Sequence, residues 1–329
     1  GVGLGATTIR GDGSATVLRL APGAGLQVRD LRIDGPDPFA APDASLRGSL
    51  PDAILAGAGS VLLLDRARVT LGGGRVASSA GSATVELRDS TVVLLRCGHD
   101  SGTCLVTDSQ VQFLSVAGGE LVVRRSALTG NLVPTIGSGA SIETTGNVLF
   151  EDSVVADTFD GLSFQVLVPA RVDLRRFSYL RNGSPLLARV PLDVSIEDAE
   201  FVDNRNRWSG DNGGPAAIHA FLGAGFDVER TSFVGNVGSG AAGGAILVEG
   251  NASLRLANST LASNGFTVEA AAGGARGGAV AVRAGTQLTS VEIIHATVVA
   301  PAVMPVGVTG SAFSVTGADA QVHMAVHNS

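Results

Sequence analysis

The sequence predicts an all-β solenoid, in which short parallel strands stack into successive coils. Two observations support this fold class. A pattern of apolar residues spaced two apart recurs along the chain, and residues at equal offsets from its second apolar position share one chemistry. Apolar residues show no sustained i, i+3, i+4 spacing, which argues against helices. The solenoid class therefore rests on periodicity and on the columns that it creates.

The repeat is clearest in "FDVERTSFVGN", residues 226–236. Its second apolar position recurs with successive spacings from 17 to 37 residues. Such uneven spacing is typical of stacked units joined by loops of unequal length. The eleven matching positions are Val28, Leu64, Leu87, Val106, Val123, Phe150, Leu174, Ile196, Val228, Leu256 and Ile293. We therefore expect about eleven coils, one for each match.

Charged residues fill the next two columns with alternating sign. We call the second apolar position of each match the anchor. The column one residue past the anchor contains Arg124, Glu151, Arg175 and Glu197. The column two residues past it contains Arg125, Asp152, Arg176, Asp198 and Arg230. Neighbouring parallel strands lie about 4.8 Å apart, so opposite charges in one column are expected to form ion pairs. These carboxylates are therefore poor candidates for acid–base catalysis, because Arg lowers their pKa and keeps them ionised.

Small polar residues occupy two further columns. The column three residues past the anchor contains Ser90, Ser109, Ser126, Ser153, Thr231 and Ser259, which suit a tight bend. The column eight residues past it contains Asn131, Thr158, Asn182, Asn204, Asn236 and Asn264. We expect these side chains to stack at a turn, and the Asn residues to hydrogen-bond one another and the free backbone groups there.

Stacked Asn residues at a turn and aliphatic inward rows resemble the right-handed parallel β-helix of pectin-lyase-like proteins, which has three short strands per coil. The tetrapeptides Phe201–Asn204 and Phe233–Asn236, together with Gly243–Ile246 and Gly277–Val280, resemble more narrowly the paired motifs of polymorphic outer-membrane protein repeats. Those repeats are typical of autotransporter passengers on bacterial surfaces. The fold resemblance covers nearly the whole chain, and the narrower motifs cover about residues 200–282. Such motifs specify a coil better than a function.

We expect one β-helix domain over 1–329, with 1–25 as an N-terminal cap or first coil, 26–300 as regular coils and 301–329 as a last, incomplete coil. Because the final segment begins a coil without completing it, further sequence or a partner chain is expected beyond Ser329. No apolar run approaches the roughly 20 residues that cross a bilayer, so no membrane span is expected in this segment.

Composition excludes several classes of function. The net charge of −7 argues against a nucleic-acid partner. All 23 basic residues are Arg, which excludes a phosphate-loop lysine or a Schiff-base lysine. The glycine-rich stretch "GSGAAGGAI" also has no amphipathic helix after it, so we expect its glycines to serve positive φ and close packing. No cofactor is predicted.

Cys97 and Cys104 bracket the segment "CGHDSGTC". A disulfide in an oxidising compartment is the leading interpretation of such a close pair. Two free thiols are the first alternative. A zinc site is the last, because His99 and Asp100 supply too few ligands. No metal site is predicted.

One insertion, "DNRNRWSGDNGG" at 203–214, contains the only Trp of the chain. Stacking of Trp208 on a sugar, with Arg205, Arg207 and Asp211 as hydrogen-bonding partners, would make a glycan contact. The alternative is that Trp208 caps an apolar edge while the arginines are solvated. If the protein is an enzyme, the catalytic candidates are Asp203, Asp211 and His219, although a single His on a strand is more often structural.

The leading functional hypothesis is a non-catalytic scaffold or adhesin, secreted or on the bacterial outer membrane, whose loops bind glycan or a cell surface. The alternative is an extracellular polysaccharide lyase or glycoside hydrolase. The Asp-Asp, Gly-His-Gly and Arg-Ile-Lys segments that the resemblance leads one to look for in such enzymes are absent from the sequence.

Overall fold

The computed structural model describes residues 7–10, 16–34, 53–70, 75–78, 82–97, 102–130, 139–164, 169, 171–207, 214–239, 243–267, 277–283, 288–299, 312–316 and 322–327. The chain divides into two compact units, which are described separately. Unit 1 comprises Gly1–Thr129 with Ala140–Val148, and unit 2 comprises Gly130–Gly139 with Leu149–Ser329. The described residues form strands, bridges, turns and bends, and no helix occurs among them.

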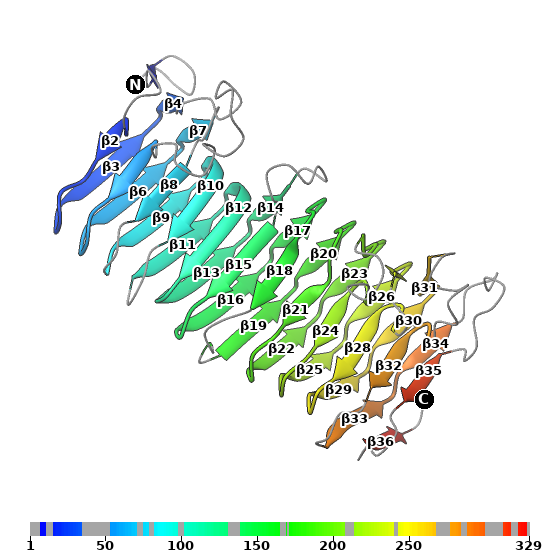
Figure 1. Cartoon of the computed structure of the whole chain (residues 1–329). Helices are drawn as coiled ribbons and strands as arrows, with labels where there is room; N and C mark the ends of the chain where they lie inside the picture. The colour runs from blue at the N-terminus through cyan, green and yellow to red at the C-terminus, as the bar shows by residue number, and fades with distance from the viewer. Residues whose placement is uncertain are drawn as a thin grey trace, which may run out of the picture. The chain divides into compact units, whose positions relative to one another are not determined.

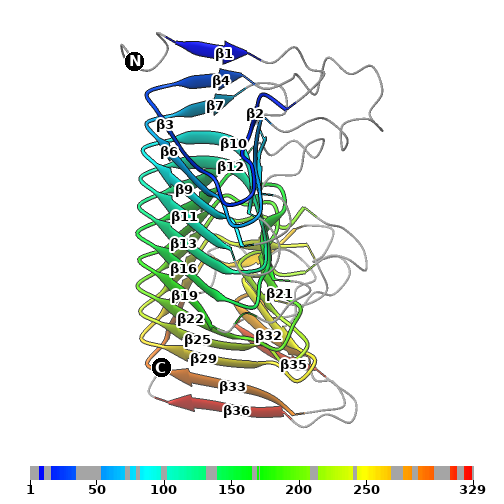
Figure 2. The same ribbon diagram turned by 90° about the vertical axis from the view of Figure 1, so that its left-hand side faces the viewer.

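Each unit is a right-handed parallel β-helix, in which a strand pairs with its counterparts in the preceding and following coils (Figures 1 and 2). The chain passes through three rows of strands in turn, which we call row 1, row 2 and row 3. This architecture confirms the fold class predicted from the repeat.

Unit 1 contains the following strands. Row 1 comprises β3 (Gly25–Arg29), β6 (Val61–Asp65), β9 (Thr84–Arg88), β11 (Thr103–Thr107) and β13 (Glu120–Arg124). Row 2 comprises β1 (Thr8–Arg10), β4 (Arg32–Asp34), β7 (Arg68–Thr70), β10 (Thr91–Cys97), β12 (Gln110–Ala117) and β14 (Ala127–Thr129). Row 3 begins with β2 (Leu18–Arg19), β5 (Ile54–Ala56) and β8 (Arg75–Ser78). A unit boundary falls within β15 (Gly139–Glu143) and another within β16 (Asn147–Glu151).

Unit 2 repeats the three rows. Row 1 comprises β19 (Arg171–Arg175), β22 (Asp193–Glu197), β25 (Gly225–Glu229), β29 (Ser253–Ala257), β33 (Thr289–Ile294) and β36 (Val322–His327). Row 2 comprises β17 (Val154–Ala156), β20 (Ser178–Leu180), β23 (Glu200–Val202), β26 (Ser232–Val234), β30 (Thr260–Ala262) and β34 (Thr297–Val299). Row 3 comprises β18 (Gly161–Phe164), β21 (Leu186–Ala188), β24 (Ile218–Ala220), β28 (Ile246–Glu249), β32 (Val280–Arg283) and β35 (Phe313–Thr316). A small extra sheet pairs β27 (Val237–Gly238) with β31 (Gly265–Phe266).

Strands β10 and β12 are longer than their neighbours in row 2. β10 pairs with β7 in row 2 through its first residues and with β8 in row 3 through its later ones. β12 runs alongside β10 over almost this whole length. Rows 2 and 3 are therefore continuous at this point, whereas in unit 2 each coil has separate short strands in the two rows.

The anchor positions of the repeat lie in register in row 1. In unit 1, Val28 pairs with Leu64, Leu64 with Leu87, and the series continues through Val106 to Val123. In unit 2, the series runs through Leu174, Ile196, Val228, Leu256 and Ile293. All ten side chains are buried, so burial of one alternate face fixes the register of row 1.

The first corner, between rows 1 and 2, consists of two residues wherever the structure describes it. The first of them has φ between 45 and 54° in every described coil. This left-handed position is the column two residues past the anchor, which contains Asp, Arg, Asn and His. The turn at each first corner therefore points the side chain at this position outward, and the equivalent side chains of successive coils lie one strand spacing apart.

Charges pair between coils within the column two residues past the anchor, as predicted. Glu151 and Glu197 of the neighbouring column, however, pair with Arg176 and Arg230 and not with Arg175, which contacts Asp173. Arg66 donates to both carboxylate oxygens of Asp30, at 2.7 and 2.9 Å. Arg125 makes the same two-pronged contact with Asp108, at 2.7 Å for each bond. In unit 2, Arg176 contacts Asp152 and Glu151, and Arg230 contacts Asp198 and Glu197.

Behind the charges, the hydroxyl column is buried and hydrogen-bonded. The Ser90 hydroxyl donates to the Arg88 carbonyl at 2.6 Å and accepts from the Ala67 N–H at 3.0 Å. Ser109, Ser126, Thr231 and Ser259 repeat the bond to the carbonyl two residues earlier. The Ser90 hydroxyl thus provides an acceptor for the Ala67 N–H and is a second donor to the Arg88 carbonyl, which also accepts from the Arg66 N–H.

The second corner, between rows 2 and 3, carries the Asn stack in unit 2. The side-chain Nδ2 of Asn182 donates to Asn204 Oδ1 at 3.1 Å, Asn204 donates to Asn236 at 2.8 Å, and Asn236 donates to Asn264 at 2.9 Å. Asn131 lies outside the described residues. Thr158 extends the stack, since its hydroxyl donates to Asn182 Oδ1 at 2.6 Å.

Two glycines of the Gly-Gly-Ala motifs adopt positive φ, 73° at Gly243 and 72° at Gly277. A Cβ on Gly243 would lie 2.6 Å from the Ile246 carbonyl oxygen, and one on Gly277 equally close to that of Val280. Only glycine fits such an approach to the following strand. This confirms that the motif serves turn geometry and close packing.

Candidate functional site

The second corner is where the coils of unit 2 differ most in length. The first corner has two residues wherever it is described, whereas the second comprises residues 157–160 and 181–185 in two coils and 203–217, 235–245, 263–279 and 300–312 in the others. In unit 1, the connection from β4 to β5 is also long, covering residues 35–53. Differences in length between the coils of unit 2 are therefore concentrated at one corner, which leads into row 3.

The predicted glycan loop belongs to this corner. Its base is fixed to neighbouring coils, because the Arg205 N–H donates to the Asn182 carbonyl and the Arg207 N–H donates to the Gly183 carbonyl, both at 2.9 Å. The buried Asn206 side chain donates to the Pro215 carbonyl at 2.9 Å and so ties the two ends of the segment together. The Arg205 and Arg207 side chains are exposed. Trp208 and Asp211 lie outside the described residues.

The structure does not pair the two described members of the catalytic candidate set. Asp203 is exposed and has φ of 53°, in the turn column that also contains Asp157 and Arg181. Arg181 and Asp157 form an ion pair at 2.7 Å. His219 lies on the outward side of β24, where Glu249 is its hydrogen-bonding partner.

His219, Glu249 and Arg283 form a chain across three adjacent strands of row 3. His219 Nε2 lies 2.8 Å from Glu249 Oε1, and Arg283 Nη1 donates to Glu249 Oε2 at 3.0 Å. The side chains of His219 and Glu249 are 19% and 14% exposed, and that of Arg283 is 47% exposed. This series of three hydrogen-bonded side chains therefore begins at a half-buried imidazole and ends at a solvated guanidinium.

The Glu249 carboxylate stays ionised despite its burial. Burial raises its pKa, but the hydrogen bond and charge of His219 and the charge and hydrogen bond of Arg283 lower it, and the net pKa lies below the ordinary value. The carboxylate also orients the imidazole. Since Nε2 faces Glu249, the other ring nitrogen, Nδ1, lies beside Gly214, where a Cβ would be 3.8 Å away.

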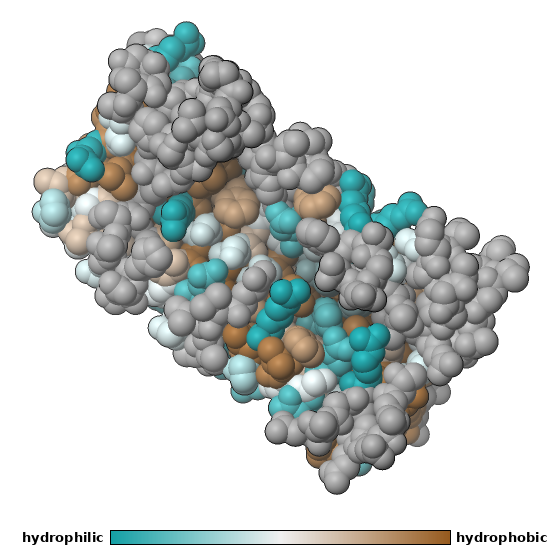
Figure 3. Space-filling view, in the orientation of Figure 1, coloured by the Kyte–Doolittle hydropathy of each residue, from teal (hydrophilic) through white to brown (hydrophobic). Residues whose placement is uncertain are grey.

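Sequence reasoning singled out His219 but missed Glu249 and Arg283. In the structure His219 aligns with Leu247, and Glu249 aligns with Arg283. The outward position of all three residues follows from strand alternation. Their distance from the preceding anchor varies with the length of the second corner, so a count from that anchor does not align them. Figure 3 shows hydrophilic surface beside apolar surface over this part of row 3 in unit 2.

Carboxylates at the first corner are held in the ionised state. Hydrogen bonds from Arg66, Arg125 and Arg230 lower the pKa of Asp30, Asp108 and Asp198, respectively; burial opposes this shift and the charge of each Arg adds to it. A general acid at neutral pH needs a raised pKa instead. These carboxylates are therefore structural.

Within the described ranges, no three His, Cys, Asp or Glu side chains form a group that could hold a metal ion. In the same part of the chain, no helix has the length and apolar character needed to cross a bilayer.

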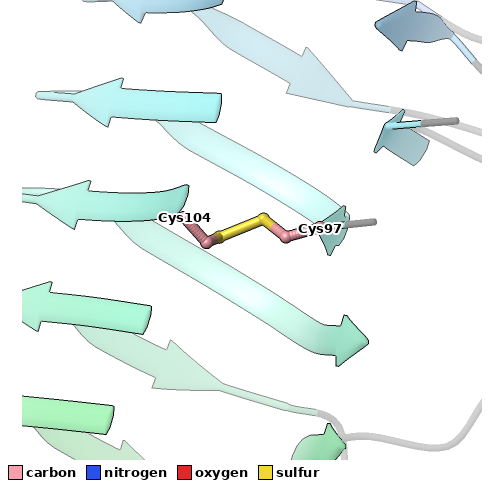
Figure 4. Close-up of a disulfide and its surroundings, with 2 residues drawn as sticks. All are labelled: Cys97 and Cys104. Atoms are coloured by element: carbon pink, nitrogen blue, oxygen red, sulfur yellow. A yellow bond between two sulfur atoms is a disulfide. The ribbon is translucent and has the colours of Figure 1, made fainter. Parts of the chain in front are cut away.

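The cysteine pair is a disulfide inside the coil. Cys97 ends β10 and Cys104 lies in β11, with their Cα atoms 5.9 Å apart (Figure 4). The two side chains are 4% and 1% exposed. They occupy inward positions, since Cys97 pairs in register with Val116 and Cys104 with Leu121. The bridge confirms the predicted disulfide and links the end of row 3 to row 1. His99 and Asp100 lie outside the described residues.

We expect neither cysteine to react with iodoacetamide when the protein is denatured without reductant. Mass spectrometry of the alkylated protein measures this. Denaturant is needed because free thiols this deeply buried would also escape labelling in the folded protein. A matched sample treated first with reductant should carry two labels. Two labels in the unreduced sample would show that the thiols are free.

Searches for related proteins found no match among protein-family models, curated proteins or solved structures.

Proposed function

We propose that the chain is a non-catalytic extracellular or cell-surface β-helix scaffold, which binds a glycan or a cell surface through the connections of its second corner. The observation that carries this proposal is the contrast between the corners. The first corner has two residues wherever it is described, while the second varies in length between the short connection 157–160 and the long connection 263–279. Binding residues are commonly carried on loops that a rigid scaffold positions.

The location is part of the same proposal. The disulfide between Cys97 and Cys104 supports an oxidising compartment, as found outside the cell or in the bacterial periplasm. The Asn stack and the Gly-Gly-Ala turns support the resemblance to pectin-lyase-like β-helices and to autotransporter passengers. A bacterial outer-membrane or secreted adhesin has all these features.

A polysaccharide lyase or glycoside hydrolase is the second candidate function. The pair of His219 and Glu249 favours it, because a carboxylate that orients an imidazole is a common way to prepare a general base. Against it, the carboxylates at the first corner whose pKa is lowered are committed to Arg. We therefore place binding ahead of catalysis.

The proposal is tested with the purified protein on a glycan array and on bacterial and host cell surfaces. We expect Trp208→Ala and the double variant Arg205→Ala, Arg207→Ala each to weaken binding about tenfold, because aromatic and Arg contacts dominate binding energy. Arg255→Ala is the matched control, since Arg255 contacts Asp227 on row 1, away from the second corner.

Loss of binding in the control alone, or equal binding by all variants, would contradict the use of the second corner. The same glycans should yield no new reducing ends and no unsaturated products after incubation. If products appear and His219→Ala abolishes them while the fold is retained, the protein is a polysaccharide lyase or glycoside hydrolase and the non-catalytic proposal is wrong.

A further inference from the structure

Row 3 of unit 2 presents two outward columns of side chains, one along the middle of its strands and one at the ends where the chain leaves row 3 for row 1. Ala188 pairs with Ala220 and Ala220 with Val248, so the residues that follow them, Arg189, Phe221 and Glu249, are successive members of one column, which Arg283 continues. The Phe221 N–H continues the ladder by donating to the Ala188 carbonyl at 3.1 Å. His219 belongs to the other column and reaches Glu249 diagonally. We call Arg189, His219, Phe221, Glu249 and Arg283 the row-3 strip.

We propose that the row-3 strip is a binding site for an uncharged glycan. This proposal rests on the proposed binding function and names both the ligand class and a surface for it on the regular strands, in addition to the connections of the second corner.

The aromatic part of the strip is Phe221. Its side chain is half-buried, and its ring centroid lies 6.0 Å from that of His219, with the two planes tilted by 37°. A Cβ on Gly250 would lie 2.9 Å from Cε2 of Phe221, so the ring lies against the backbone of the next turn. An aromatic ring fixed in this way is a suitable platform for the C–H face of a pyranose.

Three polar groups of the strip, those of His219, Glu249 and Arg283, are paired with one another. Glu249 accepts from Arg283 at 3.0 Å and is 2.8 Å from His219 Nε2, so the carboxylate needs no rearrangement to receive a ligand hydroxyl. Preorganised polar groups lose little freedom when they bind. Carboxylate oxygens accept hydrogen bonds, while guanidinium groups only donate them, so together they match hydroxyls, which do both.

The centre of the strip favours an uncharged ligand over an acidic one, because the Arg283 guanidinium there is already paired with the Glu249 carboxylate. The other arginine, Arg189, lies two strands away from Glu249. Glu249 is anionic because the neighbouring His219 and Arg283 outweigh the effect of burial and lower its pKa. A uronate or sulfate group placed beside it meets a like charge, which opposes binding. A neutral sugar meets no such repulsion and offers hydroxyl donors to the carboxylate.

The experiment is isothermal titration of the whole chain with three sets of oligosaccharides: uncharged hexose or pentose polymers, polyuronates and sulfated glycans. We expect binding from the uncharged set. Phe221→Ala should raise its Kd about tenfold, and Glu249→Gln about fivefold or more. Phe113→Ala and Glu292→Gln are matched controls, because Phe113 is half-buried in unit 1 and Glu292 faces Arg255 on row 1. Their Kd should stay within about twofold of the original.

Folding is checked for every variant by its thermal unfolding midpoint. If Phe221→Ala unfolds, Phe221→Leu replaces it, since leucine keeps apolar bulk without an aromatic face. Binding of acidic glycans alone, or of uncharged glycans without any effect of the Phe221 and Glu249 variants, overturns this site and leaves the proposed scaffold function standing. Failure to bind any glycan or cell surface overturns both.

Discussion

Replacing Phe233 with alanine is expected to lower the free energy of unfolding by about 3–5 kcal/mol. Phe233 is fully buried in β26, and its ring stacks on that of Phe201 in β23 at a centroid distance of 4.9 Å and an angle of 14°. The ring of Tyr179 follows Phe201 at 5.4 Å in the preceding coil. Alanine removes a member of this stack and leaves a cavity that the strand spacing prevents from closing. Urea unfolding followed by circular dichroism measures the change.

The matched control for Phe233→Ala is Val299→Ala in β34, the same row. Val299 is 52% exposed, so its truncation should change the free energy of unfolding by about 0.5 kcal/mol or less. A solenoid distributes stability over each coil and its two interfaces, so the loss at Phe233 should also lower the unfolding cooperativity of neighbouring coils. Similar small losses in both variants would argue that the aromatic stack does not hold the coils together.

Rows 1 and 2 were predictable from the sequence because the first corner has a constant length. With two residues between the rows, an alignment on Val228 or Leu256 also aligns the row-2 strands that follow, and the charge and hydroxyl columns appear in the sequence itself. The positive φ at residues such as Arg230 was not predicted, because Arg rarely adopts it. The ion pair with Asp198 and the buried hydroxyl of Thr231 surround this turn and hold it in place.

Row 3 was less predictable because the connection that precedes each of its strands varies in length. Connections of different length at the second corner separate its strands from the anchor that precedes them. Phe221 and Glu249 align only when counted from the anchor that follows, which lies seven residues later in both cases, whereas Arg283 lies ten residues before Ile293. The loop residues Trp208 and Asp211 lie outside the described residues, and their role stays a prediction. His219 was recognised only as a histidine on a strand. Its carboxylate partner is a neighbour in the fold, 30 residues away in the sequence.

Replacing Asn236 with alanine is expected to lower the free energy of unfolding by about 1–3 kcal/mol, although few atoms are removed. Asn236 Oδ1 accepts from the Nδ2 of Asn204 at 2.8 Å and from its N–H at 3.3 Å. Asn236 Nδ2 donates to the Phe201 carbonyl at 2.8 Å and to Asn264 Oδ1 at 2.9 Å. Asn236 is fully buried, so water cannot replace these bonds without opening the coil. Urea unfolding midpoints compared with those of the original protein measure the loss.

Two comparisons separate the hydrogen bonds of Asn236 from the loss of its volume. Asn147→Ala is the control, because Asn147 is exposed in β16, and its effect should stay within about 0.5 kcal/mol. Asn236→Asp keeps the shape and the acceptor but removes the donor and places a carboxyl group beside Asn264 Oδ1 and the Phe201 carbonyl. It should therefore destabilise the fold at neutral pH, where the carboxylate is charged, and less in acid, where protonation restores a donor. If Asn236→Asp is as stable as the original protein at neutral pH, hydrogen bonding within the stack is not what holds this corner, and side-chain volume alone explains the alanine result.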